Sequence, residues 1–359
     1  MNLRNLICWR SFKYLLGLAL LAAVGWVLVW PGTTTPPAAA QSLAIVSAVG
    51  ETVPVESSGD AADDPAIWYN AQAPERSLIL GTDKRRGLEV YDLAGERVQS
   101  LPVGRLNNVD LRQDVLLDGR RRDIAVATHR DTDSLAVFEI DAAGEVSLLG
   151  KVATGLKEIY GVCLYRHEEE LHVFTNGKDG SYLQHRLEIV QGAPQVELLR
   201  FFRLDSQPEA CVADDARSML FVGEESFGVW VMRAAPDAGT SRELVVEAQS
   251  PLEPDIEGLA LYGDRYLIVS SQGNHRFVVL EASPPYRLVG VFRVDEDSES
   301  GIGSVRETDG IEVSAHSFGE RYPMGLMVVQ SGRNASTNQN YKYLDWAQIA
   351  EALELPGLQ

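Results

Sequence analysis

The chain has 359 residues, of which 45% are hydrophobic and 23% are charged, and its formal net charge is −19. That length and apolar content suffice for one large folded domain or two ordinary ones. The strong negative charge argues against nucleic-acid binding through a basic surface, and it disfavours anionic substrates unless a cation is added.

The first forty residues differ in composition from the rest of the chain. Three cations lie ahead of an uncharged apolar run over 14–30, and a stretch rich in Thr, Pro and Ala follows. A basic start before an apolar run is typical of an export signal or a signal anchor. We therefore expect a signal or anchor with its linker over 1–40 and a folded domain over 41–359. The folded domain then works outside the cytoplasm, periplasmic or secreted, and an uncleaved 14–30 segment would tether it to the membrane.

Beyond residue 43, short β-branched or aromatic runs alternate with Gly, Asp, Asn and Pro, the pattern of many strands joined by turns. One apolar strand ending in a polar cluster recurs. Its copies are LILGTDK, DIAVATHR, HVFTNGK, MLFVGEES, YLIVSSQG and LMVVQSG, which start at 78, 123, 172, 219, 266 and 326 and so lie 45, 49, 47, 47 and 60 residues apart. Six units of about 47 residues predict an all-β, six-bladed β-propeller with a central channel. Residues 44–58 can supply a strand that closes the ring against the C-terminal blade.

A second recurring element is an acidic residue followed by an apolar run. The acids are Asp64, Asp110, Glu158, Glu209, Glu257 and Asp309, spaced by 46, 48, 51, 48 and 52 residues. Equivalent positions of propeller blades converge on the channel, so we expect these acids to ring one of its mouths. Six anions at close range need neutralising, and a hard cation with oxygen ligands, Ca²⁺ above all, would do it. The alternative for any single acid is that it caps a turn or accepts amides of the next blade.

Cationic residues end the first three copies of the recurring strand, at Lys84, Arg130 and Lys178. Tyr160 lies two residues after Glu158. A metal ion combined with Arg and Lys side chains is the chemistry of phosphoryl recognition and transfer. Each cation alone could equally be a solvated turn residue. The chain has no HExxH, GxSxG or Walker motif to indicate another chemistry.

The three cysteines, Cys8, Cys163 and Cys211, do not indicate a disulfide framework. Cys163 and Cys211 both lie in apolar, strand-like contexts, GVCLY and EACVA. The sequence favours two buried small hydrophobic side chains, and a bridge between them stays open.

The motifs DAADDPAIW, NNVD, IYGVCLY, NGKDG, PDIEGL, SSQGN and TDGIEV, in this order, resemble the β-propeller phytases, the alkaline calcium-dependent phytases of bacteria. The resemblance covers nearly the whole chain from about residue 50. It implies several Ca²⁺ ions at one mouth, some structural and some catalytic, and hydrolysis of phosphate from myo-inositol hexakisphosphate (phytate) as a calcium complex. It also implies in-line attack by a calcium-activated water, with one substrate phosphate in a cleavage site and its neighbour in an affinity site.

The resemblance assigns roles by position. It implies catalytic roles for Lys84, Arg130, Tyr160, Lys178, Glu209 and Asp309. It implies substrate contacts by Lys84, Arg130, Tyr160, Lys178 and Asp179. It implies calcium ligation by Asp63, Asp64, Asn108, Asp110, Glu209, Glu225, Asp255, Glu257, Gln272 and Asp309. The chain departs from the family pattern at Asp179, where Glu is expected, at QPEA around Glu209, where QTEG is expected, and in the loop over 295–307.

Two other functions stay open from the sequence. A calcium-dependent lactonase or esterase on the same fold would need one metal ion to polarise a carbonyl and would have no use for a cluster of Lys and Arg. A non-catalytic extracytoplasmic scaffold would bind calcium without turnover. Among these three functions we favour the phytase, acting as a monomer on phytate or related inositol phosphates.

Overall fold

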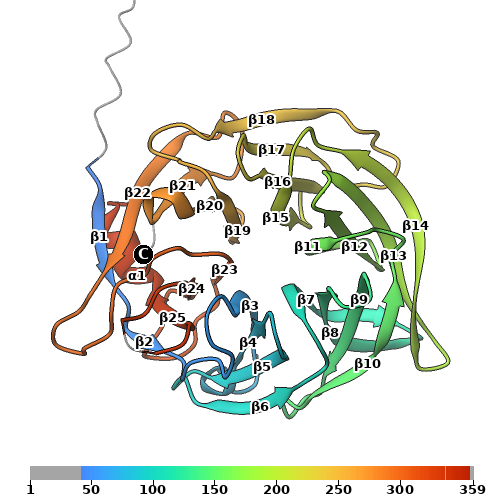
Figure 1. The fold of residues 1–359 in the computed structure, drawn as a ribbon, viewed down its shortest axis with the longest axis horizontal. Coiled ribbons are helices and arrows are strands. Elements are labelled where there is room, and N and C mark those ends of the chain that lie inside the picture. The colour runs from blue at the N-terminus through green and yellow to red at the C-terminus, as the bar shows by residue number, and fades with distance from the viewer. Residues whose placement is uncertain (1–41, 336, 356–359) are drawn as a thin grey trace, which may run out of the picture. The chain divides into compact units, whose positions relative to one another are not determined.

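The computed structural model describes residues 42–335 and 337–355, which form six antiparallel blades around a central channel (Figure 1). This confirms the predicted six-bladed β-propeller. The one α-helix of the described residues is the short α1 (Trp346–Ala352), and none of them belongs to a helix long and apolar enough to cross a membrane. The expected signal or anchor over 1–40 lies outside the described residues.

Each blade has its first strand beside the channel and its fourth at the rim (Figure 1). The blades in chain order are β3 (Ala62–Trp68), β4 (Leu78–Asp83), β5 (Gly87–Asp92) and β6 (Arg97–Leu101); β7 (Leu106–Leu117), β8 (Arg120–His129), β9 (Ser134–Ile140) and β10 (Val146–Ala153); β11 (Ile159–His167), β12 (Glu170–Gly177), β13 (Ser181–Val190) and β14 (Ala193–Arg203); β15 (Pro208–Asp214), β16 (Met219–Glu224), β17 (Gly228–Arg233) and β18 (Arg242–Glu247); β19 (Ile256–Tyr262), β20 (Tyr266–Ser271), β21 (Arg276–Glu281) and β22 (Leu288–Asp295); and β23 (Ile311–Ser314), β24 (Leu326–Ser331) and β25 (Asn340–Asp345). Two 3₁₀ turns, η1 (Pro74–Arg76) and η2 (Gln272–Asn274), lie between strands.

The N-terminal strands close the ring, as predicted for residues 44–58. β2 (Gly50–Glu51) is the outer strand of blade six and pairs antiparallel with β25, with Gly50 opposite Tyr343. β1 (Ala44–Ser47) adds a fifth, parallel strand to blade five, beside β22. The start of the domain is therefore hydrogen-bonded to its last two blades.

The hydrophobic core lies between the blades. Six clusters of buried apolar side chains each draw on two neighbouring blades; one contains Leu80 and Val90 of blade one with Ala125 and Phe138 of blade two. Because both faces of a blade are buried against neighbours, its middle strands are apolar almost throughout. The polar strand ends are left to face the two mouths of the channel.

Cys163 and Cys211 form a disulfide, with Cα atoms 5.7 Å apart. The interpretation as two separate hydrophobic side chains was therefore wrong. Cys163 lies in β11 and Cys211 in β15, the innermost strands of neighbouring blades, at a sequence separation of 48 residues. That separation is about one repeat, so the fold brings equivalent positions of two adjacent blades together.

Replacing both cysteines by alanine should lower the free energy of unfolding by about 2–4 kcal/mol, because the bridge closes a long loop in the unfolded chain. Unfolding of both proteins in guanidinium chloride under non-reducing conditions measures this difference in the free energy of unfolding. A reductant should shift the midpoint of the wild type and leave the double variant unchanged. Equal midpoints for the two proteins without reductant would contradict the prediction.

Candidate functional site

Five innermost strands carry a two-residue irregularity near their start. Strand pairing shifts between Ala62 and Pro65, Leu106 and Val109, Ile159 and Val162, Pro208 and Cys211, and Ile256 and Leu259. Such bulges re-aim side chains. The first residues of the five bulges are Asp63, Asn107, Tyr160, Glu209 and Glu257, and Asp309 holds the matching place two residues ahead of Ile311, the first residue of β23.

Most of these bulge residues meet in a cavity of about 300 Å³ at one mouth of the channel, which we call the mouth cavity. It is lined by Asp60, Asp63, Lys84, Tyr160, Glu209, Glu257, Gln272, Glu307, Asp309, Gly332 and Gln339. Six of these residues are carboxylic acids and one is a cation. The cavity therefore carries more negative charge than its own residues can balance.

Lys84 balances part of that charge. Its Nζ lies 2.6 Å from Asp60 Oδ1, 3.0 Å from Asp63 Oδ1 and 2.9 Å from Asp309 Oδ2. Burial disfavours the charged ammonium, but the charges of Asp63 and Asp309 outweigh burial and raise the pKa of Lys84. Lys84 therefore stays charged and ties blade one to blade six.

The other carboxyl groups of the cavity are poorly balanced. Burial, followed by the neighbouring charge of Glu257, raises the pKa of Glu209 well above its ordinary value. Burial raises the pKa of Glu257 to about 8, and the charges of Asp309 and Glu225 add to the effect. Burial also raises the pKa of Asp309, although Lys84 opposes it. Without an added cation, Glu257 is mostly protonated at neutral pH, and the pKa of Glu209 is shifted in the same direction.

The acidic residues fit a hard divalent cation. Glu209, Glu225 and Glu257 offer carboxylate oxygens that all lie within 4.8 Å of one another. Asp63 Oδ2 is buried and has no hydrogen-bond partner among the described residues. Anionic oxygen donors with no nitrogen or sulfur among them are the ligands that Ca²⁺ prefers. Gln272, whose Nε2 donates to Asp309 Oδ1 at 2.7 Å, adds an amide to the same wall.

Two cations flank Tyr160 at the edge of the mouth cavity. Lys178 Nζ lies 4.2 Å from the centre of the Tyr160 ring, and Arg130 Cζ lies 5.9 Å from it. Arg130 also donates to Asn107 Oδ1 at 3.0 Å. Burial and then the charges of Glu209 and Glu257 raise the pKa of Tyr160, so its hydroxyl stays protonated and hydrogen-bonds Glu209. A positive edge thus adjoins the acidic cavity.

The expected ring of six acids is wrong at three positions. Asp64 and Asp110 lie deeper in the channel, around a second, small cavity shared with Asn108. Asp64 Oδ2 accepts the Val109 amide at 3.0 Å, and Asp110 Oδ2 accepts the Leu164 amide at 2.7 Å. Both carboxylates thus bond the next blade, the alternative that the sequence left open. Glu158 is exposed just ahead of β11.

The remaining sequence-predicted residues lie near the mouth but do not line it. Glu225 accepts a hydrogen bond from Gln207 at 2.7 Å, and Asp255 is exposed close to it. Asp179 accepts from both the amide and the hydroxyl of Ser181 at 3.0 Å, which closes the turn between β12 and β13. Asp179 therefore accepts hydrogen bonds within its own turn and none from residues of the mouth cavity.

Sequence reasoning missed Asp60, Asn107 and Glu307. Asn107 Nδ2 donates to Glu209 Oε1 at 2.8 Å, and Asp60 is the closest partner of Lys84. Asp60 and Asn107 lie within the quoted DAADD and NNVD motifs, so the motifs indicated the segments. Choosing the inward-facing member of each segment needed the bulge register.

Comparisons with known proteins show which proteins the chain is similar to. The family model for the phytases matches residues 16–356. A 3-phytase from Bacillus subtilis (strain 168) is 38% identical over 335 residues, which is 87% of this chain and 87% of that protein. A solved structure, a functionally unknown protein from Desulfotomaculum acetoxidans DSM 771, aligns with a TM-score of 0.46 and 14% identity over 63% of this chain and 70% of that chain. That structural likeness is too low to carry any argument.

Asp63→Asn and Asp64→Asn form a matched pair that tests the bulge register. We expect Asp63→Asn to weaken calcium binding by at least about tenfold, because it removes a carboxylate from the mouth cavity. Asp64→Asn can still accept the Val109 amide, so its calcium affinity should stay within about threefold of wild type. Calcium titration by calorimetry measures both, and the opposite order would place Asp64 in the metal site.

Calcium binding should release protons at pH 7. Glu257, with its pKa raised to about 8, is mostly protonated at that pH and must lose its proton to bind a cation. The apparent calcium affinity should therefore rise with pH and level off above about pH 8. Calorimetry in two buffers of different ionisation enthalpy counts the protons.

Glu312 supplies the control for this experiment. Burial raises its pKa to about 8 as well, but it lines the deeper cavity of the channel and not the mouth cavity, whereas Glu257 borders both cavities. Glu257→Gln should reduce the proton release, whereas Glu312→Gln should leave it unchanged. An affinity that does not vary with pH would contradict the assignment of Glu257.

Proposed function

The chain belongs to the phytase family, and we propose a site and a mechanism by which it hydrolyses phosphoric monoesters as a 3-phytase. The proposed reaction is calcium-dependent hydrolysis of phytate at the mouth cavity. Several calcium ions, structural and catalytic, would occupy the acidic residues of this mouth. The observation that carries the proposal is an acidic cavity whose edge bears Arg130 and Lys178 beside Tyr160.

The charge arrangement suits a polyanionic substrate only when a cation is present. The six carboxylic acids of the mouth cavity would otherwise repel phosphate. Bound Ca²⁺ supplies the positive charge that offsets the phosphoryl group and lowers the pKa of a water nucleophile. The proposed holders are Asp63, Glu209, Glu225, Glu257 and Asp309.

The chain's own residues would hold two phosphates of one substrate. Lys84, which keeps its charge between Asp63 and Asp309, lies where a phosphate to be cleaved would sit. Arg130 and Lys178 would hold the neighbouring phosphate at the Tyr160 edge, since guanidinium and ammonium groups are the donors that phosphate recognition uses. The Tyr160 hydroxyl, kept protonated and donating to Glu209, would lie between the two positions.

Glu209 lies at the centre of this arrangement. It accepts hydrogen bonds from Asn107 and Tyr160, and it lies beside Glu257. These partners fix the orientation of its carboxylate toward the cavity. We assign Glu209 a positioning role for the cation and the water nucleophile.

The two alternative functions are less well supported. A lactonase or esterase has no need of two cations beside a protonated tyrosine, and a scaffold has no need of those cations at the edge of an acidic cavity. The Cys163–Cys211 disulfide supports the proposed location outside the cytoplasm, where such bonds persist.

Metal removal tests the proposed function directly. Phosphate release from phytate near pH 7 to 8 should fall by at least about a hundredfold after chelation, because the cation supplies the transition-state charge. Activity should return when Ca²⁺ is restored. Hydrolysis of an aryl ester by the same preparation tests the esterase alternative. Release that persists in the chelator, or no release from folded, calcium-loaded protein, would contradict the proposal.

A further inference from the structure

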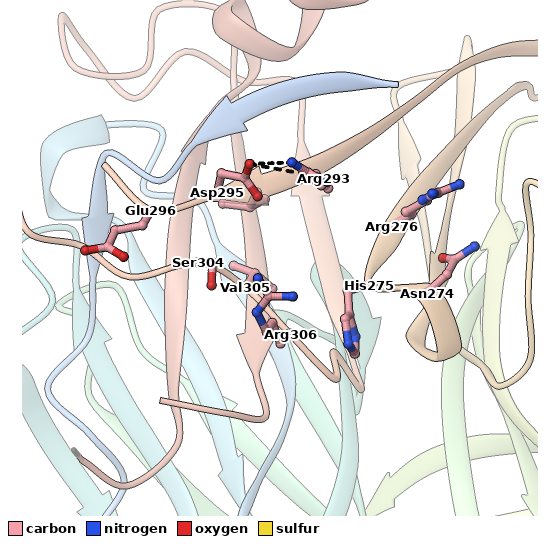
Figure 2. Close-up of a pocket in the computed structure, with 10 residues that line it drawn as sticks. Asn274, His275, Arg276, Arg293, Asp295, Glu296, Ser304, Val305 and Arg306 are labelled. Carbon is pink, nitrogen blue, oxygen red and sulfur yellow. Dashed lines mark hydrogen bonds and ion pairs between the residues drawn. The ribbon is translucent and has the colours of Figure 1, made fainter. Parts of the chain in front are cut away.

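A third cavity, of about 410 Å³, opens on blade five (Figure 2). It is lined by Asn274, His275, Arg276, Arg293, Val294, Asp295, Glu296, Ser304, Val305 and Arg306. We call it the arginine pocket. Its residues come from the turn between β20 and β21, the end of β22 and the segment ahead of β23. Nothing in the proposed reaction uses them.

One backbone segment separates the arginine pocket from the mouth cavity. Arg306 lines the pocket, and the next residue, Glu307, lines the mouth cavity. The segment is held on both sides, because Val305 donates to the Val294 carbonyl at 3.1 Å and Gly332 donates to the Arg306 carbonyl at 2.9 Å. The arginine pocket thus has an ordered wall that the catalytic mouth shares.

The pocket offers hydrogen-bond donors that lack partners. Among the described residues, no side chain makes a hydrogen bond or ion pair with the guanidinium groups of Arg276 and Arg306, whereas Arg293 is paired with Asp295 at 2.8 Å. His275 Nδ1 accepts the Glu307 amide at 3.2 Å. In the neutral ring Nε2 must then carry the proton, so it is a further donor.

The charge of the pocket is opposite to that of the chain. Three arginines face two carboxylates, and one of these, Asp295, is already paired. The other, Glu296, lies at the far end of the pocket from Arg276 (Figure 2). In a chain of net charge −19, two unpaired guanidinium groups in one concave site indicate an anion. Guanidinium groups match the geometry of phosphate oxygens with paired, forked donors.

We propose that the arginine pocket binds a phosphate group at Arg306 and His275, with Arg276 adding positive charge on the other side of the pocket (Figure 2). That phosphate has two candidate sources. It is either an outer phosphate of the inositol polyphosphate whose other phosphates occupy the mouth cavity, or a free inorganic phosphate. The first source rests on the proposed function, and the shared wall favours it. The second source is independent of that function.

The experiment compares three double variants of the calcium-loaded protein. Arg276→Ala/Arg306→Ala removes the two unpaired cations. Arg276→Lys/Arg306→Lys keeps the charge and loses the forked donors. Arg120→Ala/Arg287→Ala is the control, because it changes the net charge equally at two exposed positions, the first residue of β8 and the residue before β22, away from the strand ends that form the pocket.

Three quantities are measured for each protein. They are the affinity for myo-inositol hexasulfate by calorimetry, the KM and kcat for phytate, and the affinity for inorganic phosphate at concentrations that do not precipitate calcium. The alanine variant should weaken hexasulfate binding and raise KM by about tenfold or more, with kcat within about twofold, since a charge-assisted contact and a nearby positive charge are lost. The lysine variant should fall between it and the control, which should match the wild type.

The outcomes distinguish substrate phosphate from free phosphate, and failure of the proposed function from failure of the arginine pocket. Loss of inorganic phosphate binding with an unchanged KM for phytate would make free phosphate the ligand. If the wild type releases no phosphate from phytate but binds hexasulfate or phosphate through the two arginines, the proposed function fails and the pocket stands. Equal affinities for both anions in the alanine variant and the control would overturn the pocket.

Discussion

The rest of the structure depends on the crowding of carboxylates at one mouth of a buried channel. Each blade of a propeller directs the start of its innermost strand at the same axis, so any acid repeated there is brought close to its copies. Such groups can coexist only if they hold protons, pair with a cation or bind a metal ion. The mouth cavity uses the first two in part, through the raised pKa of Glu257 and the ammonium of Lys84.

The repeat made the fold predictable from sequence, because a period of about 47 residues is a property of the chain alone. The register of the site was not predictable in the same way. A bulge places two consecutive residues in different directions, and the sequence does not say which one faces the channel. Hence Asn107 and Tyr160 occupy the inward positions that the spacing of acids assigned to Asp110 and Glu158.

Five cationic side chains of this acidic chain lie in the mouth cavity or around it. Lys84 lies within it, Arg130 and Lys178 lie at the Tyr160 edge, and Arg276 and Arg306 lie beyond the wall formed by the segment ahead of β23. Sequence reasoning found the first three because they end copies of one strand. It missed the last two because Arg276 begins β21 and Arg306 lies in a loop, where no repeat marks them. A chain of net charge −19 repels a polyanion at long range, so such local groups must do the binding.

Asp63 and Asp64 show how the same crowding serves both fold and site. Adjacent carboxylates would repel strongly if they faced one way, but the bulge turns Asp63 toward Lys84 and Asp64 toward the Val109 amide of the next blade. A Cβ at Gly310 would lie 1.9 Å from Asp64 Oδ1, so only glycine fits there. One acid of the pair therefore joins blade one to its neighbours, and that bond holds the other in place at the mouth. Stability of the ring and geometry of the site are in this way set by the same two residues.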